Sequence, residues 1–222
     1  MLEATETKQA ELQKLAEEIA RDATLPLRDT ANLVFGEGNI DCRVMFIGEA
    51  PGFNEDRERR PFVGRGGQLL DQMIAGLGWK RADTYITNIV KRRPPDNRDP
   101  FPEEIAAYQP YLTRQIAIIN PPVIVTLGRF SMNYFLPTAK ITRDHGRALA
   151  IDGRIIFPVY HPAAALRSTE MMNTLREDFK KIPDVVAGKF APEMLPNPVT
   201  APARIEPAAH GKKSGPKQQG LF

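Results

Sequence analysis

Four short segments of the chain carry residues that could do chemistry, and three of them follow an apolar stretch. The first is Gly48-Glu49-Ala50-Pro51-Gly52, which leads to a second acid at Glu55. The others carry Phe62, Asn88 and His161. Acids and imidazoles can move protons and offset charge, whereas an amide and an aromatic ring can hold a flat polar ligand. In open α/β sheets, ligands bind at the carboxyl ends of strands, so these segments predict a ligand site. Many α/β proteins carry a glycine-rich first turn, so this pattern alone is weak evidence.

Strand and helix signals alternate along the chain. β-Branched and aromatic runs predict strands, and apolar residues spaced three and four apart predict helices. The alternation favours an α/β fold, a three-layer αβα sandwich around a central, mostly parallel, four-stranded sheet. Pro158 indicates an edge strand or a strand end. The expected strands are 42–48, 84–90, 123–128 and 154–160, and the expected helices are 4–22, 66–78, 102–119, 130–136 and 168–187.

Composition bounds the class of protein. The 222 residues, 42% of them apolar, suit one globular domain, expected at 1–188, followed by a tail. No apolar run approaches the roughly 18 to 20 residues of a membrane span. The acidic, helical start argues against a signal peptide. One cysteine excludes an internal disulfide and any all-cysteine metal site, and three scattered histidines give little support for zinc. We expect a cytoplasmic monomer without a metal.

The net charge of +3 is carried by the residues from 189 onward, so the body of the chain is formally neutral. Two basic clusters in the body lie beside the candidate site residues, where a phosphate backbone would contact them. For any single arginine, solvated loop charge is the alternative interpretation. The clusters are Arg57, Arg59, Arg60 and Arg65, and Lys91, Arg92, Arg93 and Arg98.

The order and spacing of these motifs resemble the uracil-DNA glycosylase superfamily, most closely its family 4. The resemblance covers about residues 15 to 187 and implies the fold expected above. It rests on Val34–Asn39, Gly48–Asp56, Pro61–Gly64, Ile86–Asn88, Arg93–Pro95 with Asn97–Arg98, Val125–Gly128, and His161–Pro162 with Leu166–Arg167.

The resemblance implies a role for each site residue. Phe62 would stack on a flipped uracil, and Asn88 would pair with the uracil edge and select against cytosine. The alternatives are a core phenylalanine and a structural cap. His161 would donate to the uracil oxygen on which negative charge builds. Glu55 would hold the attacking water and offset positive charge on the sugar, with Glu49 as the second acid.

The same resemblance implies residues that line the uracil pocket and contact DNA. Many superfamily members carry an acid where Ala50 stands, which shifts the burden onto Glu55. Leu166 would wedge into the duplex while Arg167 holds phosphate. The uracil pocket would also be lined by Gly48 and Ala50, and DNA would be contacted by Leu166, Arg167, Arg65, Arg93 and Arg98.

One departure from family 4 is large. Its members carry four cysteines that hold a 4Fe-4S cluster, and this chain has Ala20, Ala23, Arg92 and Tyr108 at the matching positions. Without thiolates such a cluster cannot be held, so we expect no cofactor. Packing around Tyr108 and ion pairs near Arg92 would then tie the N-terminal segment to the basic loop at 91–100.

Residues 189–222 form a basic, proline-rich segment that we expect to be disordered. Its end, Gln218-Gln219-Gly220-Leu221-Phe222, resembles the peptides by which DNA-processing proteins dock on the bacterial sliding clamp. Gln218, Leu221 and Phe222 would make that contact, although so short a match also arises by chance.

Three functional hypotheses follow. The first is a monofunctional, metal-free enzyme that excises uracil from single- or double-stranded DNA, without lyase activity because no lysine occupies the site motifs. The second is a DNA- or uracil-binding module that is recruited through its tail and has little catalytic activity. The third is a glycosylase for another deaminated or damaged base. A relative that traps uracil covalently fits poorly, because the loop at 91–100 has no histidine.

Overall fold

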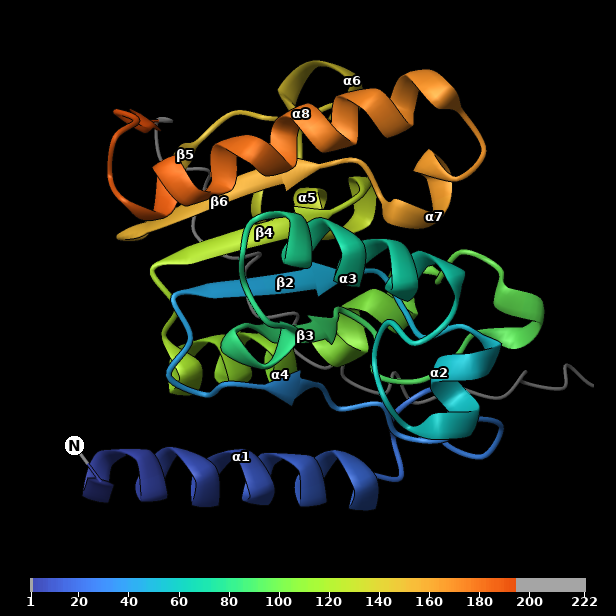
Figure 1. Cartoon of the computed structure of the whole chain (residues 1–222). Helices are drawn as coiled ribbons and strands as arrows, with labels where there is room; N and C mark the ends of the chain where they lie inside the picture. The colour runs from blue at the N-terminus through green and yellow to red at the C-terminus, as the bar shows by residue number, and fades with distance from the viewer. Residues whose placement is uncertain (1, 195–222) are drawn as a thin grey trace, which may run out of the picture.

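A computed structural model describes residues 2–194 of the chain. Within these residues, seven strands form one sheet in the order β1-β3-β2-β4-β6-β5-β7 (Figure 1). Its four central strands are mutually parallel, which confirms the predicted core of the fold. They are β3 (Tyr85–Asn88), β2 (Val44–Gly48), β4 (Val123–Leu127) and β6 (Arg154–Val159).

Three short strands extend the sheet beyond the four that the sequence predicted. β1 (Glu37–Gly38) and β5 (Leu149–Ile151) run antiparallel to β3 and β6, and β7 (Glu193–Met194) runs parallel to β5. Strands of two or three residues are too short to show a period of two. β6 is therefore not an edge strand, and Pro158 lies near its end.

The folded part of the chain continues past the boundary expected at residue 188, because β7 pairs with β5. The predicted clamp-binding residues Gln218, Leu221 and Phe222 lie outside the described residues. Among the residues that are described, no helix is both long enough and apolar enough to cross a membrane.

Helices cover both faces of the sheet, as expected for an αβα sandwich. α3 (Arg65–Gly76) and α8 (Thr169–Val186) lie on one face, and α4 (Pro102–Ile119) and α5 (Arg129–Phe135) lie on the other (Figure 1). The sheet residues alternate accordingly. Val44 and Phe46 belong to the core beneath α3 and α8, whereas Met45 and Ile47 belong to the core beneath α4 and α5.

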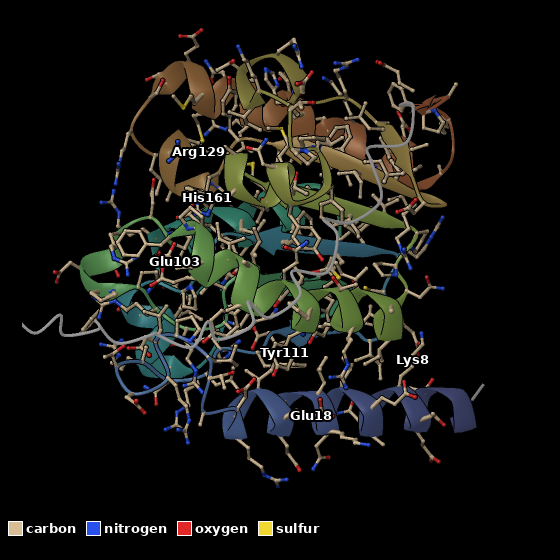
Figure 2. The ribbon with its side chains drawn as sticks, turned by 180° about the vertical axis from the view of Figure 1, so that it is seen from behind. Lys8, Glu18, Glu103, Tyr111, Arg129 and His161 are labelled. Atoms are coloured by element: carbon tan, nitrogen blue, oxygen red, sulfur yellow. The ribbon has the colours of Figure 1, made fainter. Side chains whose placement is uncertain are left out.

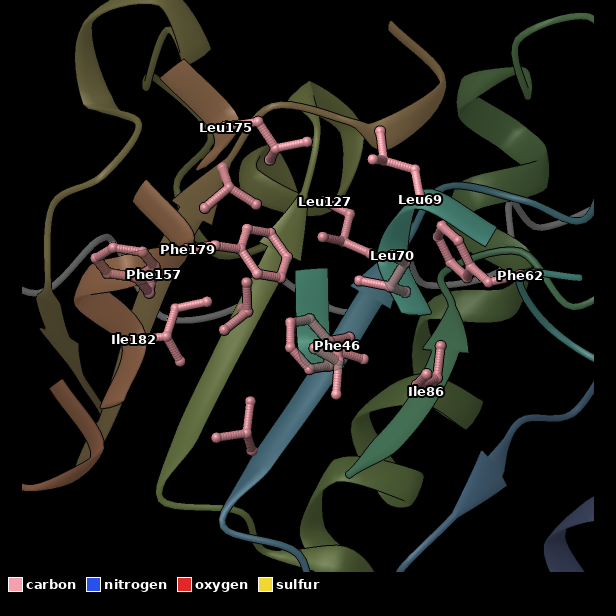
Figure 3. Close-up of a cluster of buried hydrophobic side chains, with 14 of the residues drawn as sticks. Phe46, Phe62, Leu69, Leu70, Ile86, Leu127, Phe157, Leu175, Phe179 and Ile182 are labelled. Atoms are coloured by element: carbon pink, nitrogen blue, oxygen red, sulfur yellow. The ribbon is translucent and has the colours of Figure 1, made fainter. Parts of the chain in front are cut away.

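The core beneath α3 and α8 reaches the carboxyl ends of the strands. Phe46 of β2 stacks on Phe179 of α8 with ring centres 5.9 Å apart. Leu69 and Leu70 of α3 continue this cluster to Phe62, as Figure 3 shows. The hydrophobic core therefore ends directly behind the predicted site.

Helix α1 (Leu2–Arg21) packs along α4 on the outside of the sandwich (Figure 1). Leu15 and Ile19 are fully buried against Tyr108 of α4. Several short helices lie in segments for which the sequence predicts no helix, because one or two turns leave no periodic signal. They are α2 (Phe53–Glu58), α6 (Ile141–Asp144), α7 (Pro162–Ala165) and the 3-10 turns Arg81–Asp83 and Pro95–Asn97.

Candidate functional site

A cleft of about 710 Å³ opens at the carboxyl ends of the four parallel strands. β2 ends at Gly48, β3 ends at Asn88, and His161 follows β6, so three distant motifs meet there. Of the predicted residues, Gly48, Arg93 and Leu166 are not among those lining the cleft. The lining includes Glu49, Ala50, Glu55, Phe62, Arg65, Asn88, Arg98, His161 and Arg167.

Phe62 lies where the core meets the cleft. Its side chain is 6% exposed and packs in the core cluster, as the core interpretation expects, yet it also lines the cleft. Its stacking on a base stays a prediction. Two glycines make room for it. A Cβ on Gly67 would lie 1.9 Å from the Phe62 carbonyl oxygen, and a Cβ on Gly48 would lie 2.5 Å from its ring.

The backbone of Phe62 is left-handed, with φ of 51°, which is unfavourable for a bulky residue. Arg81 stabilises this conformation by donating to the carbonyl oxygens of Pro61, at 2.6 Å, and Phe62, at 3.2 Å. Ion pairs with Glu37 and Asp71 hold the guanidinium in place. No sequence motif indicates this role of Arg81, because its partners are distant along the chain.

Glu55 holds the residues that directly follow Phe62 in the loop at 59–64. One carboxylate oxygen accepts hydrogen bonds from the backbone N–H groups of Val63, at 2.9 Å, and Gly64, at 2.7 Å. The second oxygen accepts from the N–H of Gly52 at 3.2 Å. Three backbone donors therefore occupy most of the acceptor capacity of this carboxylate.

The side chain of Asn88 is 1% exposed, and its Oδ1 is buried without a hydrogen-bond partner among the described residues. A Cβ on Gly48 would lie 2.4 Å from this oxygen, so a side chain at position 48 would block it. A buried amide normally has partners, because leaving one unpaired costs about 1 to 3 kcal/mol. A buried amide oxygen that has no partner at the lining of a cleft indicates a ligand that donates the missing hydrogen bond.

Lys91 lies behind Asn88 and is fully buried. Its Nζ donates to the Asn88 carbonyl oxygen at 2.8 Å and to Gln115 Oε1 at 2.6 Å. Burial lowers the pKa of Lys91 well below that of an exposed lysine. Arg92 is only 6% exposed. The expectation that Lys91 and Arg92 contact a phosphate backbone is therefore wrong, since both side chains are buried in the segment that follows β3.

His161 faces Phe62 across the cleft, with ring centres 5.7 Å apart and planes tilted by 30°. The N–H of Ala163 donates to its Nδ1 at 3.1 Å. Burial lowers the pKa of His161 to about 4, partly opposed by the charge of Glu55. The imidazole is therefore neutral at pH 7, and because Nδ1 accepts, its proton resides on Nε2.

Glu49 differs from Glu55 in its surroundings. It is half-buried and lines the cleft, and its carboxylate accepts no hydrogen bond from any described residue. Burial and the charge of Asp99 raise the pKa of Glu49 to about 7, while Arg129 partly opposes the shift. A carboxyl group with this pKa can take or give a proton near neutral pH.

The residues predicted to contact DNA differ in how exposed they are and in whether their side chains already have a hydrogen-bond partner. Leu166 is 37% exposed, and Arg65 and Arg167 are exposed. Arg93 instead donates through Nε to Asn97 Oδ1, at 2.7 Å. Arg129 also lines the mouth, and sequence reasoning missed it because it begins a short helix outside any motif.

The four positions that match cluster cysteines do not fit an iron–sulfur cluster, because none supplies a thiolate. Ala20 and Ala23 are exposed. Tyr108 instead donates to the Pro26 carbonyl oxygen at 2.7 Å, and Arg92 donates to that of Ala31 at 2.7 Å. Packing around Tyr108 thus agrees with the expectation. The ion pairs expected near Arg92 are absent from the described residues, and backbone carbonyls take their place.

The cleft combines an aromatic ring, an unpaired buried amide and a neutral imidazole at the strand ends of an αβα sandwich. Such a set defines a site for a flat, polar ring of the size of a nucleobase. The class indicated by fold and site is therefore a nucleobase-binding α/β protein.

Comparison with known proteins narrows that class. The model of the Uracil DNA glycosylase superfamily matches residues 35–182, more than half of the chain. The chain is 48% identical over 182 residues to the Type-4 uracil-DNA glycosylase of Sulfurisphaera tokodaii, covering 77% of this chain and 83% of that protein. It is 41% identical over 181 residues to the Type-4 uracil-DNA glycosylase of Thermotoga maritima, covering 79% and 94%. The chain belongs to the uracil DNA glycosylase superfamily.

The hydrogen bond from the Tyr108 hydroxyl to Pro26 joins α4 to the segment after α1, and its contribution to stability can be tested. Tyr108→Phe leaves the Pro26 carbonyl without its partner, and we expect the free energy of unfolding to fall by about 1 to 2 kcal/mol. Urea denaturation measures this loss. Tyr134→Phe is the matched control, because its hydroxyl bonds Thr113 at an exposed position. Equal losses in the two variants would contradict a specific fastening role for Tyr108.

Proposed function

We propose that the protein removes uracil from DNA by hydrolysing the N-glycosidic bond, which leaves an abasic site for base excision repair. The observation that carries the proposal is the orphaned Asn88 amide beside the Phe62 ring. Superfamily membership and the names of the relatives support uracil as the base.

In the proposed binding mode, the flat shape of the base is recognised before its hydrogen-bonding groups. A base that has left the DNA stack enters the cleft and stacks on Phe62, whose ring position is fixed by Gly48 and Gly67. The Asn88 amide then pairs with the polar edge of the base. Uracil presents an N–H and a carbonyl there, so it satisfies an amide oxygen and an amide N–H together, whereas cytosine lacks that ring N–H.

His161 serves the leaving group. As the glycosidic bond breaks, negative charge builds on the uracil ring and its oxygens. The Nε2–H group of the neutral imidazole can donate a hydrogen bond to such an oxygen. The Ala163 N–H donates to Nδ1 and so keeps the ring proton on Nε2. A donor fixed before the reaction stabilises the transition state without reorganisation.

We assign the attacking water to Glu49 rather than to Glu55, where the resemblance placed it. The carboxylate of Glu55 is occupied by three backbone donors, which suits a residue that positions the Phe62 loop. The carboxylate of Glu49 has no such partners and a pKa of about 7, which suits a general base. In its charged form it also offsets positive charge on the sugar.

The proposed reaction is monofunctional and needs no iron–sulfur cluster. Among the described residues, no lysine lines the cleft, so none is placed to form a Schiff base with the abasic sugar. Lys91, though close to Asn88, is buried behind it. Action as a monomer, and clamp docking through Gln218, Leu221 and Phe222, stay predictions.

The proposal is tested with oligonucleotides that contain one uracil in single-stranded, U·G and U·A forms, with alkali cleavage of the abasic product as the readout. Wild type is expected to cleave, and His161→Ala and Glu49→Gln to be severely impaired. No cleavage in any context would contradict uracil excision. Binding without cleavage would then favour a recruitment module or another damaged base.

Asn88→Ala provides the sharpest test of base recognition. We expect it to slow uracil excision at least about tenfold, because the polar edge of uracil would be buried without a hydrogen-bond partner, which costs about 1 to 3 kcal/mol. Gln13→Ala, which removes an exposed amide on α1, is the matched control and should retain full activity. Excision by Asn88→Ala within about threefold of wild type would contradict the recognition role.

The pKa of Glu49 predicts the pH dependence. A general base must be deprotonated, so the single-turnover rate should rise with pH through about 7 and level off above it. His161, with a pKa of about 4, stays neutral over this range and adds no limb. Glu49→Gln should lower the rate about 10²- to 10⁴-fold and remove the limb. A wild-type rate that is flat across neutral pH would contradict the assignment.

A further inference from the structure

Three phenylalanines at the mouth of the cleft each lie against an arginine. Phe53 is 55% exposed and Phe101 is 48% exposed, which is unusual for rings of this size, and Phe130 is half-buried. We call the three pairs the Phe–Arg rim. They are Phe53 with Arg93, Phe101 with Arg98 and Phe130 with Arg129, whose guanidinium carbons lie 5.1, 3.7 and 4.4 Å from the ring centres.

One loop, residues 93–99, connects the whole rim. Arg93 and Arg98 belong to it, and its Asp99 forms an ion pair with Arg129. Asn97 of the same loop accepts from Arg93. Figure 2 shows Arg129, His161 and Glu103 toward one end of the molecule and Lys8 toward the other. The rim therefore lies at the cleft end of the sheet.

A buried carboxylate fixes the geometry of the pair formed by Phe101 and Arg98. Glu104 is 4% exposed, and its two oxygens accept from both terminal nitrogens of Arg98, at 2.8 and 2.7 Å. It also accepts from the backbone N–H of Phe101 at 2.7 Å. Because Glu104 occupies the hydrogen-bonding edge of Arg98 and neutralises its charge, this arginine offers a flat face rather than a free charge.

We propose that the Phe–Arg rim is a stacking platform for unpaired bases of single-stranded DNA next to the nucleotide in the cleft. Every base has an apolar face that stacks on phenylalanine or on a guanidinium plane, so such a surface tolerates any sequence. In a duplex these faces are hidden between neighbouring base pairs. The platform therefore favours single-stranded over double-stranded DNA, an inference that rests on the proposed function.

Two observations favour DNA over a protein partner, for which aromatic and arginine side chains are also suited. Phe53, Arg98 and Phe130 line the same cleft that would take the flipped base, so the rim continues the proposed nucleotide site. In addition, Arg98 and Arg129 are each paired with an acid, which leaves stacking as their main contribution.

The test measures binding to uracil-free oligonucleotides by fluorescence anisotropy, so it does not depend on excision. Phe53→Leu and Phe101→Leu remove the rings from exposed positions and keep apolar side chains. We expect each to raise the Kd for a single strand about fivefold or more. The Kd for the matching duplex should change less than about twofold, and the salt dependence of single-strand binding should stay the same because no phosphate contact is lost.

Two control variants complete the design. Phe101→Trp keeps an aromatic face and should bind the single strand as wild type does. Phe190→Leu alters another exposed phenylalanine, 43% exposed and located after α8, and should change neither Kd. Unchanged single-strand binding by both rim variants would overturn the proposal and favour a protein partner for this surface. Equal losses on single strand and duplex would overturn it too. Failure of uracil excision alone would leave these binding results intact.

Discussion

The site depends on how Phe62 is held: its backbone is left-handed and its ring lies against Gly48. A left-handed backbone at a bulky residue costs about 1 to 3 kcal/mol and persists only where its surroundings enforce it. Here Arg81 holds the carbonyl oxygens of residues 61 and 62, and Glu55 holds the N–H groups of residues 63 and 64. A Cβ on Gly48 would collide with both the Phe62 ring and Asn88 Oδ1, so the absence of a side chain there keeps the ring and the amide side by side at the cleft.

The electrostatics of the cleft follow from burial rather than from a dense set of charges. Partial burial keeps His161 neutral and raises the pKa of Glu49 towards neutrality. Full burial takes Lys91 out of contact with solvent and leaves it to support the end of β3 through the Asn88 carbonyl. The same fold thus places a neutral imidazole, a carboxyl group with a raised pKa and an unpaired amide oxygen in one cleft.

Much of this arrangement was predictable from sequence, because local patterns encode it. The β-branched and aromatic runs predict the four strands, their alternation with helices predicts a parallel sheet, and the polar residues that end the strands predict the cleft. Three features could not be predicted from the sequence, because they depend on contacts between residues that are distant along the chain. Arg81 meets the Phe62 loop, Lys91 meets Gln115 of α4, and Asp99 meets Arg129, and no local pattern announces any of them. The run of basic residues from Lys91 to Arg93 therefore predicts one basic cluster, although its first two members are buried.

The most direct test of the account is a crystal structure of the Glu49→Gln variant bound to a single-stranded oligonucleotide with one uncleaved deoxyuridine. The account predicts that uracil lies against the Phe62 ring, that its polar edge pairs with the Asn88 amide, and that His161 Nε2 faces a uracil oxygen. A uracil bound outside the cleft, or bound within it with the Asn88 amide still unpaired, would contradict the account.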